Sequence, residues 1–335
     1  MASAVLPLSG LQLGVETTKG TAVATTRELY PSSTGYFDPG FIWDRHEGAQ
    51  RGTFGNITHA TLKGYLPTIG YTSEPSHGLT YDELPIIMSQ LKAGLTGTGA
   101  SADKAWTVAK AGATTATYDT YTFNAFDGSQ AFEFAYGFMT RFTISGGFDD
   151  LTQTSWDIVG RQASKVTVDA VAANNAVKIP SGLWTLKYAA AQASLTGASA
   201  YTNTMRNWEL AVDLPQNPRF YGDGNLYFGQ GVASRNLGGT LTMTWDSNSD
   251  AVAMYDLFAA GTPAFFRLQA TGPALGGTTY IAGPIDVCVI LDPVTPLASE
   301  SDGVMEYTLV GHLAYDATWA AVIDMSATCS IAALP

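Results

Sequence analysis

The chain has 335 residues, of which 46% are hydrophobic and only 14% are charged, and its net charge is −12. This length predicts about two domains, each with enough apolar residues to fill a core. The acidic balance excludes strong binding to nucleic-acid phosphates, which needs a basic surface. The scarcity of charge indicates a surface that is largely covered by partner subunits.

The sequence pattern indicates neither a targeting signal nor a cysteine-based site. The first residues, 1–7, carry no basic region followed by an apolar core, and no segment has the length of a membrane span. We therefore expect a protein without a membrane anchor that is made in the cytoplasm. Cys288 and Cys329 are the only cysteines, too few for a disulfide framework.

The first predicted elements are a strand over residues 65–71 and a helix from Thr80 to Gly94. The helix is indicated by an apolar stripe at spacings of three and four residues and by glycine at its end. Thr80 and Glu83 form a capping-box pattern, and Pro85 fits the first helical turn. The stripe consists of Leu84, Ile87, Met88 and Leu91.

Two further strands complete the first half. Residues 132–144 alternate between large and small or polar side chains, which predicts a long strand with one buried face. Residues 156–160 predict a closing strand. The Ala/Gly/Thr-rich stretch 97–120 between the helix and these strands reads as a long hairpin or loop.

The second half repeats this arrangement. A strand is predicted over residues 240–245 and a shorter helix ends at Gly261, with an apolar stripe formed by Met254, Leu257 and Phe258. An alternating strand over 285–292 and a closing strand over 307–311 follow. The sequence thus predicts a mainly β protein of two similar domains, 1–168 and 182–335, each with one short α-helix, joined by a linker over 169–181.

No pattern predicts catalysis, a cofactor or a metal site. The histidines have no ligand spacing to one another or to acids, and they are His46, His59, His77 and His312. Adjacent carboxylates such as Asp149 and Asp150 point to opposite faces of a strand and suit a turn better than an acid/base pair. No nucleotide-binding or nucleophile motif follows a strand. We expect no enzyme activity.

One segment near the start resembles a known family. Residues 13–24, with Gly14, Glu16 and the run Gly20-Thr21-Ala22, are similar to the opening of tail tube (major tail) proteins of long-tailed phages, siphophage-like tails. The resemblance implies two tail-tube-type β-barrel or sandwich domains in one chain. It implies a structural virion protein in which three chains form a pseudo-six-fold ring, and in which stacked rings form a hollow conduit for DNA.

Partners and a lumen wall follow from the same resemblance. It implies contacts with a tape-measure protein, with the tail terminator and with distal tail or baseplate proteins, while genomic DNA passes through without specific binding. Loops 25–53 and 97–120 are candidate arms between subunits or rings. Asp157, Asp292 and Glu306 lie on the polar faces of predicted strands and are the lumen-wall candidates.

Two other interpretations stay open. The second half is either a copy of the first or an unrelated decorating β domain, and the latter would give hexameric rings. From a different class, an adhesin-like or carbohydrate-binding β-sandwich would use an aromatic platform. Its members would be Trp208, Tyr221, Tyr227 and Phe228.

Overall fold

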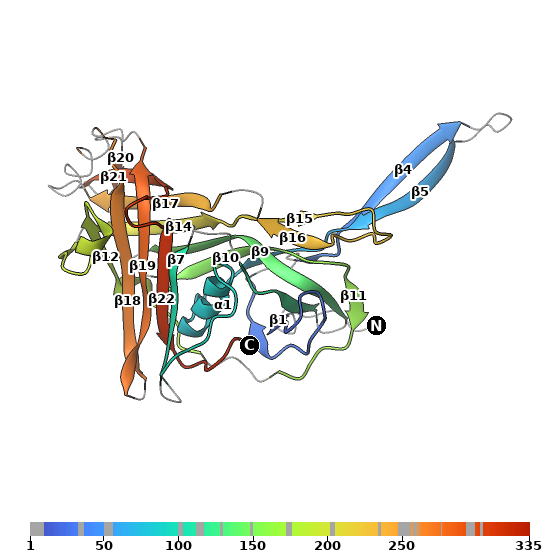
Figure 1. The fold of residues 1–335 in the computed structure, drawn as a ribbon, viewed down its shortest axis with the longest axis horizontal. Helices are drawn as coiled ribbons and strands as arrows, with labels where there is room; N and C mark the ends of the chain where they lie inside the picture. The colour runs from blue at the N-terminus through green and yellow to red at the C-terminus, as the bar shows by residue number, and fades with distance from the viewer. Residues whose placement is uncertain are drawn as a thin grey trace.

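The computed structural model describes most of the chain. The described residues are 10–32, 37–49, 56–99, 103–111, 117–127, 130–147, 150–171, 176–201, 205–233, 236–246, 256, 259, 261–275, 277–292, 299–301 and 304–335. The structure is mainly β, as predicted, and its named strands pair antiparallel (Figure 1). Within the described residues, no helix has the length and apolarity needed to cross a membrane.

Strands of the N-terminal half pair in the order β2–β1–β8–β9–β10–β6–β3. The bounds of these strands are β1 Gly10–Val15, β2 Arg27–Leu29, β3 Phe37–Asp38, β6 Thr68–Thr72, β8 Tyr121–Phe126, β9 Ala131–Gly147 and β10 Gln153–Val159. A hairpin, β4 (Phe41–Ala49) with β5 (Asn56–Tyr65), stands between β3 and β6 in the chain.

The C-terminal half shows the same series of pairings, β13–β12–β18–β19–β21–β17–β14. These strands are β12 Trp184–Ala189, β13 Ala200–Tyr201, β14 Met205–Asp213, β17 Gly238–Asp246, β18 Ala264–Leu275, β19 Thr278–Leu291 and β21 Val304–Leu313. The hairpin β15 (Gln216–Arg219) with β16 (Gln230–Ala233) stands between β14 and β17. Each strand therefore has the same place in the chain order of its half.

One strand pair joins the two halves into a continuous sheet. β9 pairs along its C-terminal part with β14, from Arg141 opposite Asp213 to Gly147 opposite Asn207. The resulting sheet runs β3–β6–β10–β9–β14–β17–β21, and the short strand β20 (Ser299–Ser301) adds to β21. The halves thus share one sheet rather than meeting only through a linker.

The C-terminal end ties the halves together a second time. β7 (Lys104–Ala111), within the stretch predicted as a hairpin or loop, folds back on Thr98 through a bridge at Ala105 and pairs along its length with β22 (Ile323–Cys329) near the end of the chain. The amide and hydroxyl of Ser330 both donate to the Asp82 carboxylate, at 2.9 and 2.7 Å. The shorter β11 (Ser164–Val166) adds to β9.

The first helix is shorter than predicted. A 3-10 turn, η2 (Tyr81–Glu83), leads into α1 (Leu84–Ser89), and Gly94 lies beyond it with φ +68°. Every residue of α1 is buried, since the helix lies inside the core rather than on a surface. The Thr80 amide donates to the Glu83 carboxylate at 3.0 Å, as the capping-box pattern predicts. Two further 3-10 turns are η3 (Ser181–Leu183) and η4 (Gln192–Ser194).

The second predicted helix lies mostly outside the described residues. Met254, Leu257 and Phe258 belong to that part, and of the predicted helix Asp256 and Ala259 are described as helical.

The alternation in β9 is interrupted, contrary to the prediction of one continuous face. Phe134, Phe142 and Ile144 pack in the main core, but Tyr136 and Phe138 belong to a separate cluster with Phe228. Tyr136 has φ 59°, and the pairing with β10 shifts register between Asp157 and Ile158. Such irregularities insert an extra residue and turn the following side chains to the other face.

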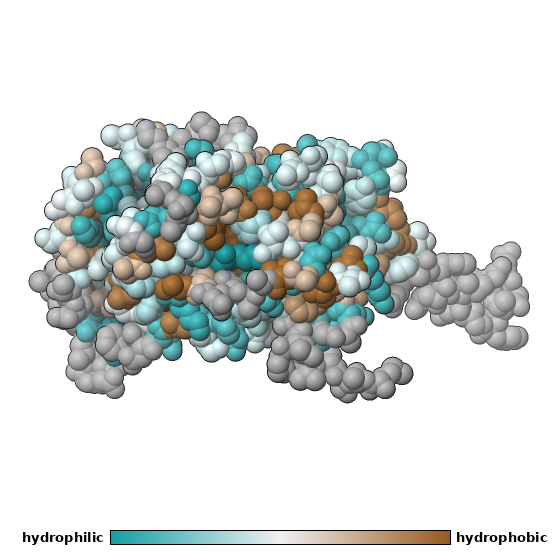
Figure 2. Space-filling view, turned by 90° about the horizontal axis from the view of Figure 1, so that it is seen from below, coloured by the Kyte–Doolittle hydropathy of each residue, from teal (hydrophilic) through white to brown (hydrophobic). Residues whose placement is uncertain are grey.

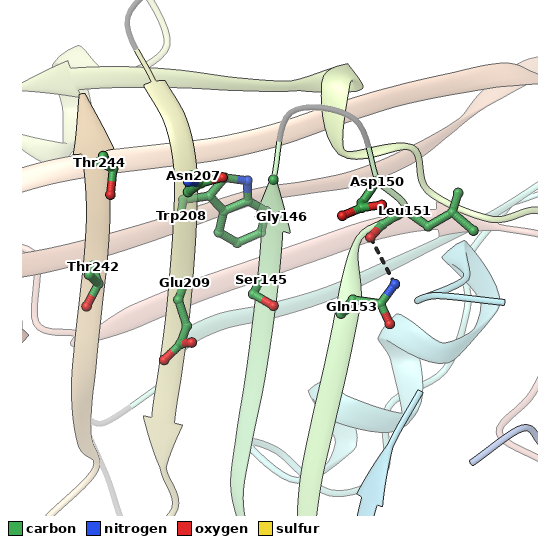
Figure 3. A pocket seen from close by; sticks show the side chains of 11 residues that line it. Ser145, Gly146, Asp150, Leu151, Gln153, Asn207, Trp208, Glu209, Thr242 and Thr244 are labelled. Carbon is green, nitrogen blue, oxygen red and sulfur yellow. Dashed lines mark hydrogen bonds between the residues drawn. The ribbon is translucent and has the colours of Figure 1, made fainter. Parts of the chain in front are cut away.

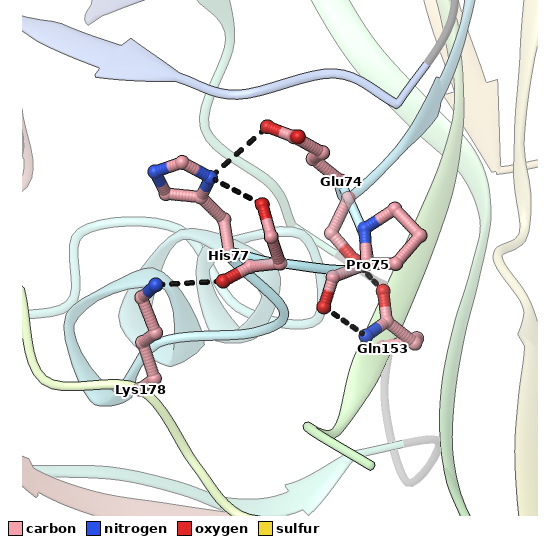
Figure 4. Close-up of polar contacts among 7 residues, drawn as sticks. Glu74, Pro75, His77, Gln153 and Lys178 are labelled. Carbon is pink, nitrogen blue, oxygen red and sulfur yellow. Dashed lines mark hydrogen bonds and ion pairs between the residues drawn. The ribbon is translucent and has the colours of Figure 1, made fainter.

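A turn after β6 fastens this sheet to the segment that precedes η3. Gln153 of β10 donates to the carbonyl of Pro75 at 3.4 Å, and Lys178 donates to the carbonyl of Ser76 at 2.7 Å. His77 is 3.0 Å from Glu74 in the same turn (Figure 4). The turn positions β6 and β10 at the start of the shared sheet.

Candidate functional site

A polar sheet face extends across both halves of the chain. Residues opposite one another in register share a face, and every second residue of a strand returns to it. The pairings place Asp157 opposite Arg141 and Arg141 opposite Asp213. From Asp213 the same face continues through Ala211 to Thr240 and then to His312.

All three lumen-wall candidates lie on this polar face. Asp157 is exposed on β10. Glu306 lies on β21 opposite Asp246 of β17. Asp292 follows β19, where its carboxylate is 2.9 Å from the ring nitrogen Nε2 of His312. The structure therefore brings the three strands onto one surface, although the three acids are spread along it rather than clustered.

The opposite face of the same sheet is apolar. Alternate residues of β10, β9, β14, β17 and β21 point into the core and are buried, and they include Trp156, Phe142, Ile144, Leu210, Val212, Leu241, Met243, Trp245 and Leu309. This burial fixes which side chains face outward, because a slip by one residue would expose the whole apolar set. The polar face is thus specified by the packing behind it.

Acidic side chains outnumber basic ones on the polar face. The acids are Asp157, Glu209, Asp213, Asp246, Glu306 and Asp292, and the basic residues are Arg141, Arg206 and His312. Arg141 Nε lies 3.7 Å from the Asp213 carboxylate, and Arg206 pairs with both Asp246, at 4.0 Å, and Glu306. Both arginines are therefore neutralised by neighbouring acids, and the face keeps a negative balance.

Hydroxyl and amide side chains also lie on this face. Thr240, Thr242 and Thr244 follow one another along β17. Next to Thr242 and Thr244 an open pocket of about 340 Å³ is lined by Glu209, Asn207 and Ser145, among others. Figure 3 shows these side chains on neighbouring strands, with Ser145 of β9 opposite Glu209 of β14. Among the described residues, no group of three or more His, Cys, Asp or Glu is placed to hold a metal ion.

The sequence reading missed several residues of the polar face. On β14, Asn207, Glu209 and Asp213 alternate with Trp208, Leu210 and Val212, which is the period-2 signal of a half-buried strand. This alternation predicts that Glu209 and Asp213 face outward. The role of Arg141 depends on pairing between the two halves, which no local pattern reveals.

The Gly-x-Glu segment has a structural role in the N-terminal half. Glu16 is buried, and its carboxylate accepts hydrogen bonds from the amides of Gly20 and Tyr136, at 2.6 and 2.7 Å. The hydroxyls of Thr120 and Thr122 also donate to it, at 2.7 and 3.2 Å. The carboxylate thereby holds the turn after β1 against β8 and against the irregular point of β9.

Glycine is required at position 20 of this segment. Gly20 has φ +80°, which side chains with a Cβ rarely adopt. A Cβ there would also lie 2.2 Å from Nη1 of Arg161. The spacing between Glu16 and Gly20 is therefore explained by the turn that joins them and by the close approach of Arg161 to that turn.

The four aromatic residues considered as a sugar platform do not form one surface. Trp208 is buried in the main core, 4.9 Å from Trp184 between ring centroids. Phe228, in the loop that joins β15 to β16, is buried in the separate cluster, and Tyr221 in the same loop is exposed. Seen from below, hydrophobic residues instead form patches among polar ones over the body of the protein (Figure 2).

Comparison with known proteins gives no family assignment. The chain matches no protein-family model and no curated protein.

Proposed function

We propose that this chain is a structural subunit of a phage tail tube, located in the virion. In this proposal residues 1–168 and 182–335 are two tail-tube-type domains, and residues 169–181 link them. Three chains form a pseudo-six-fold ring, and stacked rings form the conduit for DNA. The tape-measure protein, the terminator and the distal tail or baseplate proteins are the expected partners.

The observation that carries the proposal is the polar, acidic sheet face that spans both halves. A tube for DNA needs an inner wall to which phosphates do not adhere, and affinity for DNA comes mainly from basic contacts with phosphates. A face on which Arg141 and Arg206 are paired with acids offers few such contacts. Asp157, Asp292 and Glu306 then line the lumen.

The repeated pairing series supports a closed ring. In the described part of the chain, β3 pairs only with β6, and β20 pairs only with β21. By position in the two series, β3 corresponds to β14, and β20 corresponds to the C-terminal part of β9. Since β9 and β14 pair within the chain, pairing of β20 with β3 of the next copy repeats the same contact head to tail.

A charge reversal on the polar face tests the lumen assignment. Asp157 is suitable, because its side chain is solvent-accessible and, unlike Asp292, it is not bonded to His312. We expect wild-type tubes to exclude short double-stranded DNA and tubes of the Asp157→Lys variant to retain it. The retained DNA should dissociate when salt is raised from about 50 to about 500 mM.

The matched control is Asp223→Lys, at an exposed turn outside this face. Co-sedimentation of labelled DNA with assembled tubes is the measurement. Asp157→Lys tubes that still exclude DNA, or control tubes that retain it equally, would contradict the lumen assignment.

A further inference from the structure

The two hairpins occupy equivalent places in the two halves. β4–β5 stands between β3 and β6, and β15–β16 stands between β14 and β17. Ile69 and Met243 are equivalent, because Ile69 pairs with Ile158 and Met243 with Leu309 at matching points of the closing strands. In the sequence, Phe54-Gly55 comes fifteen residues before Ile69, and Phe228-Gly229 comes fifteen before Met243. Phe54-Gly55 lies outside the described residues, so this match concerns the sequence alone.

The C-terminal hairpin lies across the N-terminal half. Phe228 is fully buried, with its ring 5.4 Å from that of Tyr136 and 5.8 Å from that of Phe138. Arg161 donates to the carbonyl of Phe228 at 3.1 Å, and the Tyr118 hydroxyl donates to the carbonyl of Gly231 at 2.8 Å. The N-terminal half therefore provides a seat for this hairpin, made by Tyr136 and Phe138 within β9, Arg161 just after β10 and Tyr118 just before β8.

The equivalent seat in the C-terminal half is uncovered. Gly160 and Gly311 each come two residues after the equivalent residues Ile158 and Leu309, so His312 corresponds to Arg161, and its partner Ile290 corresponds to Tyr136. Ile290 is 44% exposed, and the side chain of His312 is 58% exposed. Within the described chain, no hairpin lies over them as β15–β16 lies over Tyr136 and Arg161.

The N-terminal hairpin is joined to its own chain at its base, where the Tyr65 amide donates to the carbonyl of Leu226 at 2.7 Å. β4 and β5 pair with each other and extend away from the body at the upper right of Figure 1, on the side opposite β18 and β19. At its base Phe41, Ile42 and Trp43 are 50%, 42% and 50% exposed. A lone two-stranded hairpin is marginally stable, and exposed apolar residues of this kind mark an interaction surface.

We propose that the β4–β5 arm of one copy lies across the Ile290–His312 surface of a second copy. It does so as β15–β16 lies across Tyr136 and Arg161 within one chain. The partner is a second copy because β3, from which the arm departs, is the edge that faces β20 of the next chain in the proposed ring. The choice of a second copy as the partner rests on the proposed ring. The new element is the surface on which the arm binds.

A cysteine pair tests the seat directly. The chain carries Asn56→Cys at the start of β5 together with Ile290→Cys, while Cys288 and Cys329 are both buried. Under mild oxidation of the assembled protein we expect covalent dimers and trimers on a non-reducing gel. The control pairs Asn56→Cys with Leu183→Cys, since Leu183 is an exposed residue of η3 away from this surface, and it should stay monomeric.

A second variant separates this inference from the tube proposal. Ile290→Glu should lower the fraction of chains in rings at least tenfold, whereas Leu183→Glu should leave it unchanged. Absence of the covalent ladder, or rings of Ile290→Glu as abundant as wild type, would overturn the seat of the arm. Wild-type protein that forms no rings at all would contradict the tube proposal, and the cysteine pair would still decide where the arm binds.

Discussion

Glu16 shows how one buried carboxylate organises a turn whose partners lie far apart in the sequence. Its two oxygens accept from donors at positions 20, 120, 122 and 136, which belong to the turn, to the residues that lead into and form β8, and to β9. Charge-assisted hydrogen bonds of this kind are the stronger ones in proteins. The short motif near the start of the chain therefore stabilises the N-terminal half.

Glu16→Ala should lower the free energy of unfolding by about 3 kcal/mol, because it leaves buried donors without acceptors. Chemical denaturation monitored by tryptophan fluorescence measures this. Glu74→Gln is the matched control, since Glu74 is a half-exposed acid paired with His77, and we expect its effect to stay within about 0.5 kcal/mol. A Glu16→Ala variant as stable as the control would refute the role assigned to Glu16.

Glu83 makes stability depend on pH. Burial raises the pKa of Glu83 from 4.5 to about 7, although the hydrogen bond from Thr80 and the nearby Arg27 oppose this rise. The folded state then binds a proton that the unfolded chain has lost. This contribution to stability is complete below pH 4.5 and is lost as pH rises through 7.

Glu83→Gln removes this proton linkage. We therefore expect the stability of the variant relative to wild type to increase between pH 4.5 and pH 8, by on the order of 3 kcal/mol. Urea unfolding at both pH values measures the difference, with Glu209→Gln on the exposed polar face as control. A constant difference between wild type and Glu83→Gln across this range would show that Glu83 titrates as an ordinary acid.

At the scale of elements, the β9–β14 pair determines how the two halves behave. β14 lies between β9 and β17, and the large core cluster contains residues of both halves. β22 and β7 add a second connection between them. Because the halves share a sheet and a core, they should unfold together.

Ala211→Pro should destabilise both halves at once. Ala211 pairs with Thr143 and Thr240 in the middle of the sheet, where proline removes a ladder hydrogen bond and costs about 3 kcal/mol. Calorimetry should give one transition for wild type and one, at lower temperature, for the variant. Two separate transitions, of which only one moves, would mean that the halves fold independently.

Sequence patterns could predict which side chains face outward within single strands. The alternation around Trp156 and Tyr307 placed Asp157 and Glu306 on polar faces, and the structure has both on one polar face. The irregularity at Tyr136 was not predictable, because φ 59° there is held by Glu16 and other distant residues. The β22–β7 and β9–β14 pairs join segments remote in sequence, and local propensity carries no information on such partners.

At the scale of the whole molecule, the same pairing series occurs twice in one chain, and the proposed ring repeats its internal β9–β14 junction between chains. Two equivalent units in each subunit let three subunits form six equivalent positions in a ring. In that arrangement the polar face points inward, and the β4–β5 arm reaches the neighbouring subunit. An unrelated second domain would instead require six chains.

The number of chains per ring tests this account most directly. Electron microscopy of the purified, concentrated protein, with averaging of end-on ring views and native mass spectrometry of single rings, measures it. We predict hollow rings of three chains with pseudo-six-fold density and stacks of such rings. A strictly monomeric protein would contradict the tube, and rings of six chains would contradict the proposal that each chain supplies two equivalent units.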